Sequence, residues 1–148
     1  MRDELVVFAA PNHPLAGKKS LKRADVMAYD WILREPGSGT RSTVENAFGK
    51  DLQHLSVRLE LEHTEAIKRA VEAGLGLGCI SRLALRDAFR RGSLVPLDVT
   101  DLDLRRSFYL VRHRHKYISG GLALLIEHIR AFTGDATSTD DLELTPVP

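Results

Sequence analysis

Several features are scarce or missing in this sequence, and each absence excludes a class of protein. The 148 residues include a single cysteine, so no disulfide can form within the chain, and a zinc site of several thiolates is excluded. No apolar run approaches the ~20 residues that a helix needs to span a bilayer. The opening Met1-Arg2-Asp3-Glu4 lacks the charged, apolar and small-residue layout of a signal peptide. We therefore expect a cytoplasmic protein with no membrane partner.

The sequence also lacks an excess of either charge. Lysine and arginine number 21 against 20 aspartate and glutamate, which gives a net charge of +1. A surface built throughout to hold nucleic acid needs clustered cations, so we expect no specific DNA binding by this chain itself. What the sequence does have is 43% apolar and 28% charged residues, the composition of a globular protein with a core. Its length suits one domain or two small lobes.

Strand-like and helix-like patterns alternate along most of the chain. Short apolar or alternating runs predict strands over residues 5–10, 29–33, 55–61, 79–80, 94–97 and 107–111. Apolar positions at helical spacing predict helices over 21–28 and 83–89, and around 44–48, 66–71 and 122–132. This alternation predicts an α/β fold with a mainly parallel sheet flanked by helices. Ligands of such sheets bind at the carboxyl ends of the strands.

Hydroxyl side chains are placed to begin three of these helices. Ser20 precedes the first helix, and Thr64 precedes the helix at 66–71. Ser42 and Glu45 have the spacing of a capping box in the helix that contains Val44. We expect Ser20, Ser42 and Thr64 to be N-caps.

The most informative stretch joins the strand at 29–33 to the next helix. It carries two glycines and two hydroxyl side chains at a helix start: Pro36, Gly37, Ser38, Gly39 and Thr40. Glycine lets the backbone N–H groups approach a bound group, and the dipole of a helix start favours an anion. We expect this loop to bind a carboxylate, sulfate or phosphate, with charge added by Arg41. The alternative is a tight turn and a capped helix without a ligand, which is common in α/β proteins.

A second strand end meets a helix start at Glu62-His63-Thr64-Glu65. Thr64 as an N-cap alone is a sufficient reason for a threonine at this position. If the two loops face one crevice, however, the Thr64 hydroxyl and the first loop together would form a site for an anionic or polar ligand.

Three other features are interpreted as structural. Glycines 74, 76 and 78 leave a helix and enter a strand, the reverse of a dinucleotide fingerprint, so they predict a helix end and tight packing. Cys79 lies in an apolar strand and is expected to be a buried thiol. His113 and His115 lie in a basic segment that is expected to be solvated. We expect no catalytic residue, metal site or cofactor.

Three segments, in this order, resemble the effector-binding domain of LysR-type transcriptional regulators. They are Asp-Glu-Leu-Val-Val-Phe-Ala-Ala-Pro-Asn-His-Pro-Leu from residue 3, Trp-Ile-Leu-Arg-Glu-Pro-Gly-Ser-Gly-Thr-Arg from residue 31, and Ala-Ile-Lys-Arg-Ala-Val-Glu-Ala-Gly-Leu-Gly-Leu-Gly from residue 66. Each segment alone is weak evidence, but their order and spacing are specific. The resemblance covers residues 3–132.

The resemblance implies a fold similar to type 2 periplasmic binding proteins, with two α/β lobes around a small effector. Residues 1–93 would be the complete second lobe with a crossover strand, 94–134 the returning crossover and part of the first lobe, and 135–148 a disordered tail. In the family, the loops matched here by residues 36–40 and by Thr64 and Glu65 face the effector.

The expected function is therefore sensing of a small, anionic inducer that controls DNA binding by an N-terminal domain outside this chain. The chain would be a fragment of such a regulator and not an enzyme. The apolar stripe at 122–132 would lack part of its packing surface, so we expect a homo-oligomer. One alternative is a free-standing solute-binding protein of the same fold. Another is a small enzyme that uses His63 or Cys79 beside the first loop.

Overall fold

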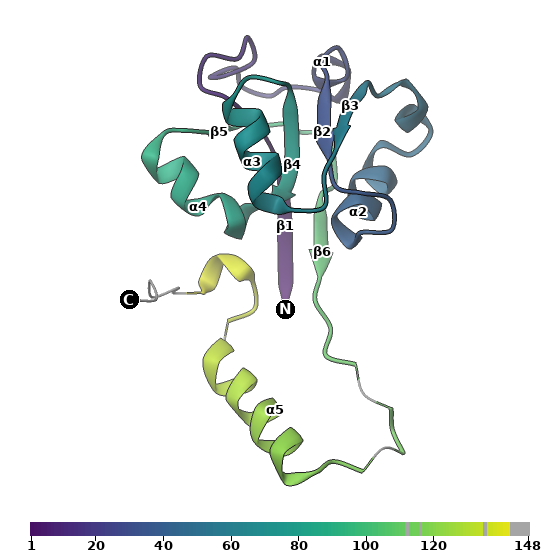
Figure 1. The fold of residues 1–148 in the computed structure, drawn as a ribbon, viewed down its shortest axis with the longest axis vertical. Coiled ribbons are helices and arrows are strands. Elements are labelled where there is room, and N and C mark those ends of the chain that lie inside the picture. Colours follow the sequence, from purple (N-terminus) through teal and green to yellow (C-terminus); the bar gives the residue numbers. More distant parts are fainter. Residues whose placement is uncertain (112, 116, 135, 143–148) are drawn as a thin grey trace. The chain divides into compact units, whose positions relative to one another are not determined.

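The computed structural model describes residues 1–111, 113–115, 117–134 and 136–142. The chain divides into two units (Figure 1): Glu4–Arg106, and Met1–Asp3 together with Ser107–Pro148. The larger unit is built on a sheet with the strand order β3-β2-β4-β1-β5, in which β6 also pairs with β1. The strands are β1 (Arg2–Ala9), β2 (Trp31–Leu33), β3 (Val57–Glu60), β4 (Leu77–Ser81), β5 (Val95–Pro96) and β6 (Arg105–Ser107). The helices of this unit are α1 (Arg23–Met27), α2 (Gly39–Phe48), α3 (Thr64–Glu72) and α4 (Arg82–Arg91), with a 3-10 helix η1 (Gly49–His54).

Strand direction decides which loops share an edge of the sheet. β2 is parallel to both of its neighbours, β3 and β4, so these three strands end at the same edge. β1 runs antiparallel to β4 and to β5. The short β5 contains Pro96, which fits the edge strand predicted at 94–97 because proline cannot donate to a ladder.

Both faces of the sheet are covered, as the sequence predicted. Alternate residues of β1 point to opposite sides: Leu5, Val7 and Ala9 join one apolar cluster, whereas Val6 and Phe8 join the other. The first cluster includes the apolar residues of α1 and α2, and the second includes those of α3 and α4. The α/β fold with helices on the two faces of its sheet is confirmed.

Two glycines that follow α3, Gly76 and Gly78, are required by close packing. A Cβ atom at Gly76 would lie 2.4 Å from the Asp30 carbonyl oxygen, and Gly76 itself has φ +153°. A Cβ atom at Gly78 would lie 2.5 Å from the Phe8 ring and 3.1 Å from Val71 of α3. The interpretation of these glycines as packing residues is confirmed.

Replacing Gly78 with alanine should destabilise the larger unit. The added methyl would overlap the Phe8 ring in the core, and overpacking of this kind costs about 1–3 kcal/mol of unfolding free energy. Urea unfolding followed by the fluorescence of Trp31, which is fully buried in this unit, measures the loss. Gly39→Ala is the control because nothing lies within 4 Å of a Cβ atom there, so it should unfold at or above the wild-type midpoint. Equal midpoints for all three proteins would contradict the packing interpretation.

The predicted cap of α1 and the predicted bounds of the last strand are wrong. Ser20 is not the cap of α1: it has φ +54°, its N–H donates to the Asp98 carboxylate (3.3 Å), and the N-cap is Lys22, whose own N–H donates to Asp25 (2.7 Å). The last predicted strand, 107–111, is β6 at Arg105–Ser107 instead. The Phe108 N–H still donates to the Met1 carbonyl (2.8 Å), and residues 109–111 belong to no strand.

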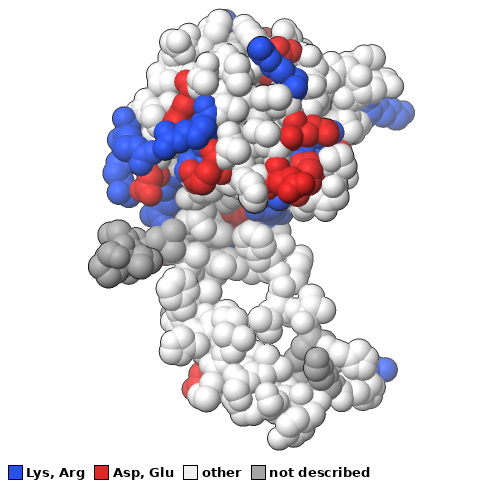
Figure 2. Space-filling model, in the orientation of Figure 1, with Lys and Arg blue, Asp and Glu red and all other residues white. Residues whose placement is uncertain are grey.

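The second unit contains α5 (Gly120–Thr133) and the 3-10 helix η2 (Thr139–Asp141). α5 matches the predicted final helix, and Gly134 is its C-cap. None of its residues is buried, and Leu124, Leu125 and Phe132 are each more than half exposed. In the view of Figure 2, few charged side chains cover this unit. Such an apolar face is what self-association would cover, and the homo-oligomer stays a prediction.

Part of the predicted tail has an ordered place within the same unit. The Arg2 N–H donates to the Thr137 carbonyl (2.8 Å), and the buried Thr139 hydroxyl donates to the Asp3 carboxylate (2.9 Å). Ser138 and Asp141 form a capping box around η2. Residues 136–142 therefore hold defined structure against the start of β1. Residues 135 and 143–148 of the predicted tail lie outside the described residues.

Candidate functional site

The loop predicted to bind an anion, residues 36–40, lies at the carboxyl end of β2 and leads directly into α2. The N-cap of α2 is Ser38, whose Oγ accepts a hydrogen bond from the Arg41 N–H (3.0 Å). Ser42, the cap predicted from the sequence, lies one turn inside the helix and donates to the Ser38 carbonyl (3.2 Å). The helix start is thus four residues earlier than predicted, which places Gly39 and Thr40 in the first turn. Pro36, Gly37 and Gly39 are exposed, Ser38 is half-buried and Thr40 is buried.

The second predicted loop lies at the carboxyl end of β3. Thr64 is the first residue of α3 and not its cap, which is His63, and the His63 side chain makes no capping hydrogen bond. Thr64 is half-buried, whereas Glu65 is exposed and forms an ion pair with Lys68 (2.8 Å). The Thr64 hydroxyl is therefore available at the start of a helix, while the Glu65 carboxylate is already partnered.

The two loops are neighbours because β2 and β3 are adjacent parallel strands. The Leu61 N–H donates to the Leu33 carbonyl (2.9 Å) at the point where both strands end. The pKa of the Glu35 carboxyl in the first loop is lowered, chiefly by its hydrogen bond with Arg34 and to a smaller extent by the charge of His63 in the second loop. The structure thus brings the predicted residues of the two loops to the same edge of the sheet.

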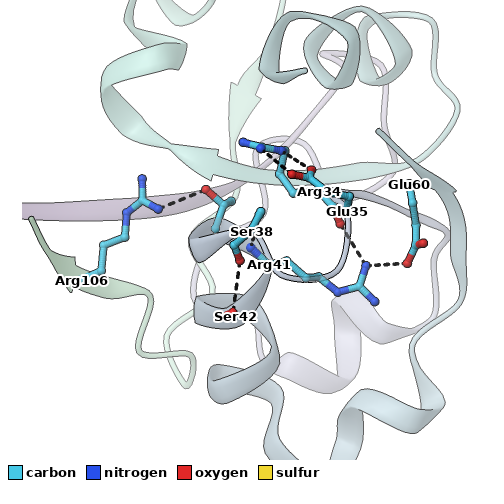
Figure 3. A network of polar contacts seen from close by, with 8 residues as sticks. Arg34, Glu35, Ser38, Arg41, Ser42, Glu60 and Arg106 are labelled. Carbon is cyan, nitrogen blue, oxygen red and sulfur yellow. Dashed lines mark hydrogen bonds and ion pairs between the residues drawn. The ribbon is translucent and has the colours of Figure 1, made fainter. Parts of the chain in front are cut away.

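Arg41, which the sequence suggested as a source of charge for the ligand, has a different role. Its side chain is only 10% exposed, and it forms ion pairs with Glu45 of α2 and Glu60 of β3, both at 2.8 Å. The same guanidinium donates to the Arg34 carbonyl (3.2 Å), so it links β2, α2 and β3 (Figure 3). With two carboxylates against one guanidinium, Arg41 offers no net positive charge to an anion.

A second arginine reaches the first loop from the opposite side. Arg106 of β6 donates from Nη1 to the Thr40 hydroxyl (3.1 Å), and Figure 3 shows it approaching α2 from the side away from Arg41. The positive charge of Arg106 also slightly opposes the rise in the pKa of Cys79 in β4. The sequence analysis missed this residue, because nothing in the local sequence distinguishes Arg106 from its neighbour Arg105.

The remaining charges around the two loops are largely balanced. Arg34 forms a two-point ion pair with Glu35 (2.7 and 2.9 Å), and this hydrogen bond is the main cause of the raised pKa of Arg34. Glu62 adds a negative charge close enough to raise the pKa of Arg34 further. A net positive field therefore cannot come from Arg34 or Arg41.

Cys79, His113 and His115 lie outside the two loops. Cys79 is 1% exposed, and burial raises the pKa of its thiol to about 12, which suits a core residue and not a nucleophile. His113 and His115 are exposed, with ring centroids 5.7 Å apart, and they belong to no strand. Among the described residues, no group of three metal-binding side chains is close enough to hold an ion. Every helix in the described part of the chain falls short of the length and apolar character that a membrane crossing needs.

Cys79 should resist thiol reagents in the folded protein. Labelling by Ellman's reagent at pH 8 should be at least about a hundredfold slower than in urea, which corresponds to an opening free energy of about 2.7 kcal/mol. The folded thiol keeps its proton up to a pKa of about 12, against 9.0 for an ordinary thiol. Unfolding free energy should therefore fall as pH rises from about 9 toward 12, because only the unfolded state loses the proton in that range. Rapid labelling of native protein would instead support the enzyme hypothesis.

Comparison with known proteins shows which proteins this chain resembles. The family model described as "LysR substrate binding domain" matches residues 1–134. The uncharacterized HTH-type transcriptional regulator YeiE of Escherichia coli K12 is 40% identical over 129 residues, which are 86% of this chain and 43% of that protein. The RuBisCO operon transcriptional regulator of Allochromatium vinosum is 38% identical over 119 residues, 80% of this chain and 39% of that protein. The chain thus spans less than half the length of these two curated relatives.

A solved structure shares both the fold and a substantial part of the sequence. It is the regulatory domain of CcmR from Synechocystis PCC6803 in complex with 2-PG, with a TM-score of 0.80 and 32% identity. The alignment covers 92% of this chain and 65% of that domain. The family model and this solved structure thus both match the chain to the ligand-binding domain of a regulator.

Proposed function

Because this chain belongs to the family of the LysR substrate binding domain, we propose that its β2–α2 and β3–α3 loops form part of the binding site for a small anionic effector. The residues proposed to contribute are those predicted from the sequence: Pro36, Gly37, Ser38, Gly39, Thr40, Thr64 and Glu65. Glu65 contributes least, because Lys68 already binds its carboxylate. The bound effector is a small molecule with a carboxylate or another oxyanion.

The observation that carries this proposal is the meeting of two helix starts at one edge of the sheet. α2 and α3 both begin where parallel strands end, and the backbone bond between Leu61 and Leu33 holds those ends together. Two sets of unpaired helical N–H groups at one place favour a negatively charged group. The Ser38 Oγ accepts from the Arg41 N–H, so the hydroxyl proton is left to donate to a ligand.

The relatives support sensing over catalysis. The curated proteins that this chain resembles are transcriptional regulators, and one effector domain at 32% identity was solved with a small molecule bound. We propose that a longer regulator containing this chain uses the effector to change how a separate domain binds DNA. A free-standing solute-binding protein is the alternative, and the names of these relatives favour the regulator.

The proposal is tested by titrating the ¹⁵N-labelled chain with 2-PG and following backbone amide shifts. Residues 37–40 and 64–65 should shift in a saturable way, because they surround the proposed anion position, where the Ser38 N–H stays bonded to the Glu35 carbonyl (3.3 Å). Thr40→Val and Thr64→Val should each weaken binding about tenfold, since each removes a hydroxyl from a charged ligand. Thr43→Val is the matched control: its hydroxyl donates to the Gly39 carbonyl (2.9 Å) within α2, so affinity should stay at the wild-type value.

Two results would overturn the site. In the first, 2-PG produces no saturable shift at these six residues at any concentration up to its solubility limit. In the second, binding is saturable, but the shifts lie elsewhere and the two threonine variants bind as the control does.

A further inference from the structure

We propose that residues 136–142, named the strap below, form a releasable element of the smaller unit. The strap closes this unit on the start of the chain, and its release frees α5 while the larger unit stays folded. The two effector loops take no part in this device, so it goes beyond the proposed function and does not depend on it.

The strap is bound to the start of the chain at two consecutive residues. The Arg2 N–H donates to the Thr137 carbonyl (2.8 Å), and Arg2 forms a parallel β-bridge with Ser138. Arg2 Nη2 also donates to the Thr137 hydroxyl (3.1 Å). At the next residue, the Thr139 hydroxyl donates to the Asp3 carboxylate (2.9 Å), and a hydrogen bond to a charged group is stronger than one between neutral groups. The strap thus closes a loop that runs through almost the whole chain.

The contact between Thr139 and Asp3 is buried although both side chains are polar. Thr139 is 1% exposed and Asp3 is 2% exposed. Among the polar and charged residues that the structure describes, none is more deeply buried than these two. A buried polar group that loses a partner bears the cost of its own desolvation. This hydrogen bond should therefore govern how often the strap opens.

The smaller unit has little apolar packing to hold it closed. Of the buried apolar residues in the described part of the chain, Leu142 alone belongs to this unit, and all the others lie between residues 5 and 104. α5 buries none of its residues, and Leu124, Leu125 and Phe132 are each more than half exposed. Elements with few buried apolar contacts open at a lower free energy than a core does. The smaller unit can therefore open while the core of the larger unit stays closed.

Hydrogen bonds within the strap preserve its shape. The Asp141 carboxylate accepts from the Thr137 N–H (3.1 Å) and the Ser138 N–H (3.0 Å), and the Asp140 N–H donates to the Ser138 hydroxyl (3.4 Å). These bonds join neighbours in the sequence and do not involve the start of the chain. A segment that is already ordered loses less conformational freedom when it docks. The strap can therefore leave and return as one piece.

The other end of the α5 segment has an anchor of its own. The Phe108 N–H donates to the Met1 carbonyl (2.8 Å), and the Met1 ammonium donates to the Phe108 carbonyl (3.2 Å). This anchor precedes α5 in the chain, whereas the strap follows it. Release of the strap thus leaves α5 attached through Phe108 and frees its C-terminal end.

The test is native-state hydrogen exchange of the ¹⁵N-labelled chain, measured at three backbone amides. The Arg2 amide reports the strap, because it donates to the Thr137 carbonyl. The Phe108 amide reports the other anchor, and the Trp31 amide, which donates to the Ser56 carbonyl (2.8 Å), reports the larger unit. In the wild type, the protection factor at Arg2 should be at least about tenfold lower than at Trp31.

Thr139→Val removes the hydroxyl and keeps the shape of the side chain. Exchange at Arg2 should become at least about tenfold faster, as expected for a lost hydrogen bond to a charged group, and the two other amides should change less than about twofold. Thr139→Ser keeps the hydroxyl and should stay within about threefold of the wild type. The matched control is Thr133→Val, whose hydroxyl binds carbonyls within α5, so exchange at Arg2 should keep the wild-type rate.

Four results would overturn the proposal. Unchanged exchange at Arg2 in Thr139→Val would show that the buried bond does not hold the segment. Equal acceleration at Arg2 and Phe108 would show that the smaller unit opens as a whole, and equal acceleration at Trp31 would show global unfolding. If Thr139→Ser exchanges as fast as Thr139→Val, the hydroxyl is not the cause. Because no ligand is added, each outcome is independent of the effector site.

Discussion

The contact on which the rest of this site depends is the set of bonds made by the buried Arg41 side chain. It binds Glu45 within α2, Glu60 on β3 and the Arg34 carbonyl at the end of β2. One side chain thus fixes the start of α2 relative to two strands. The two carboxylates are 36% and 43% exposed, so these pairs add only modest stability, and their effect is to fix the position of the Arg41 guanidinium and the first loop.

The fixed loop gives the site its chemistry. A rigid turn that leads into α2 presents backbone N–H groups with little loss of conformational freedom on binding, which favours even a small ligand. The neighbouring α3 begins at the same edge because β3 is parallel to β2. Arg41 is neutralised by Glu45 and Glu60, so it positions the loop and adds no net positive charge.

Much of the fold could be predicted from local patterns. The continuous apolar run from Leu5 to Ala10 predicted a strand buried on both faces, and the glycines at 74–78 predicted a helix end followed by close packing; both are confirmed. Helix starts were harder, because Ser38 and Ser42 are both hydroxyls with capping potential and only the turn geometry chooses Ser38. The strand at 107–111 was misplaced because apolar β-formers such as Val111 dominate that stretch, whereas β6 is set by its pairing with β1, a contact distant in the sequence.

The site could be predicted only in part. Its loops follow from strand ends and helix starts, which are local, so the place of residues 36–40, Thr64 and Glu65 at one sheet edge could be predicted, while their role in binding stays a prediction. The partners of Arg41 and the position of Arg106 depend on tertiary contacts: 19 residues separate Arg41 from Glu60, and 66 separate Arg106 from Thr40. No local pattern carries that information. Sequence reasoning therefore could not foresee that Arg41 has two carboxylate partners.

The most direct measurement is a crystal structure of this chain with 2-PG. The account predicts an anion bonded to the backbone of Gly39 and Thr40, with Arg41 still bound to Glu45 and Glu60. An anion bound away from these loops would contradict it. So would Arg41 turned away from its two carboxylates to bind the anion itself.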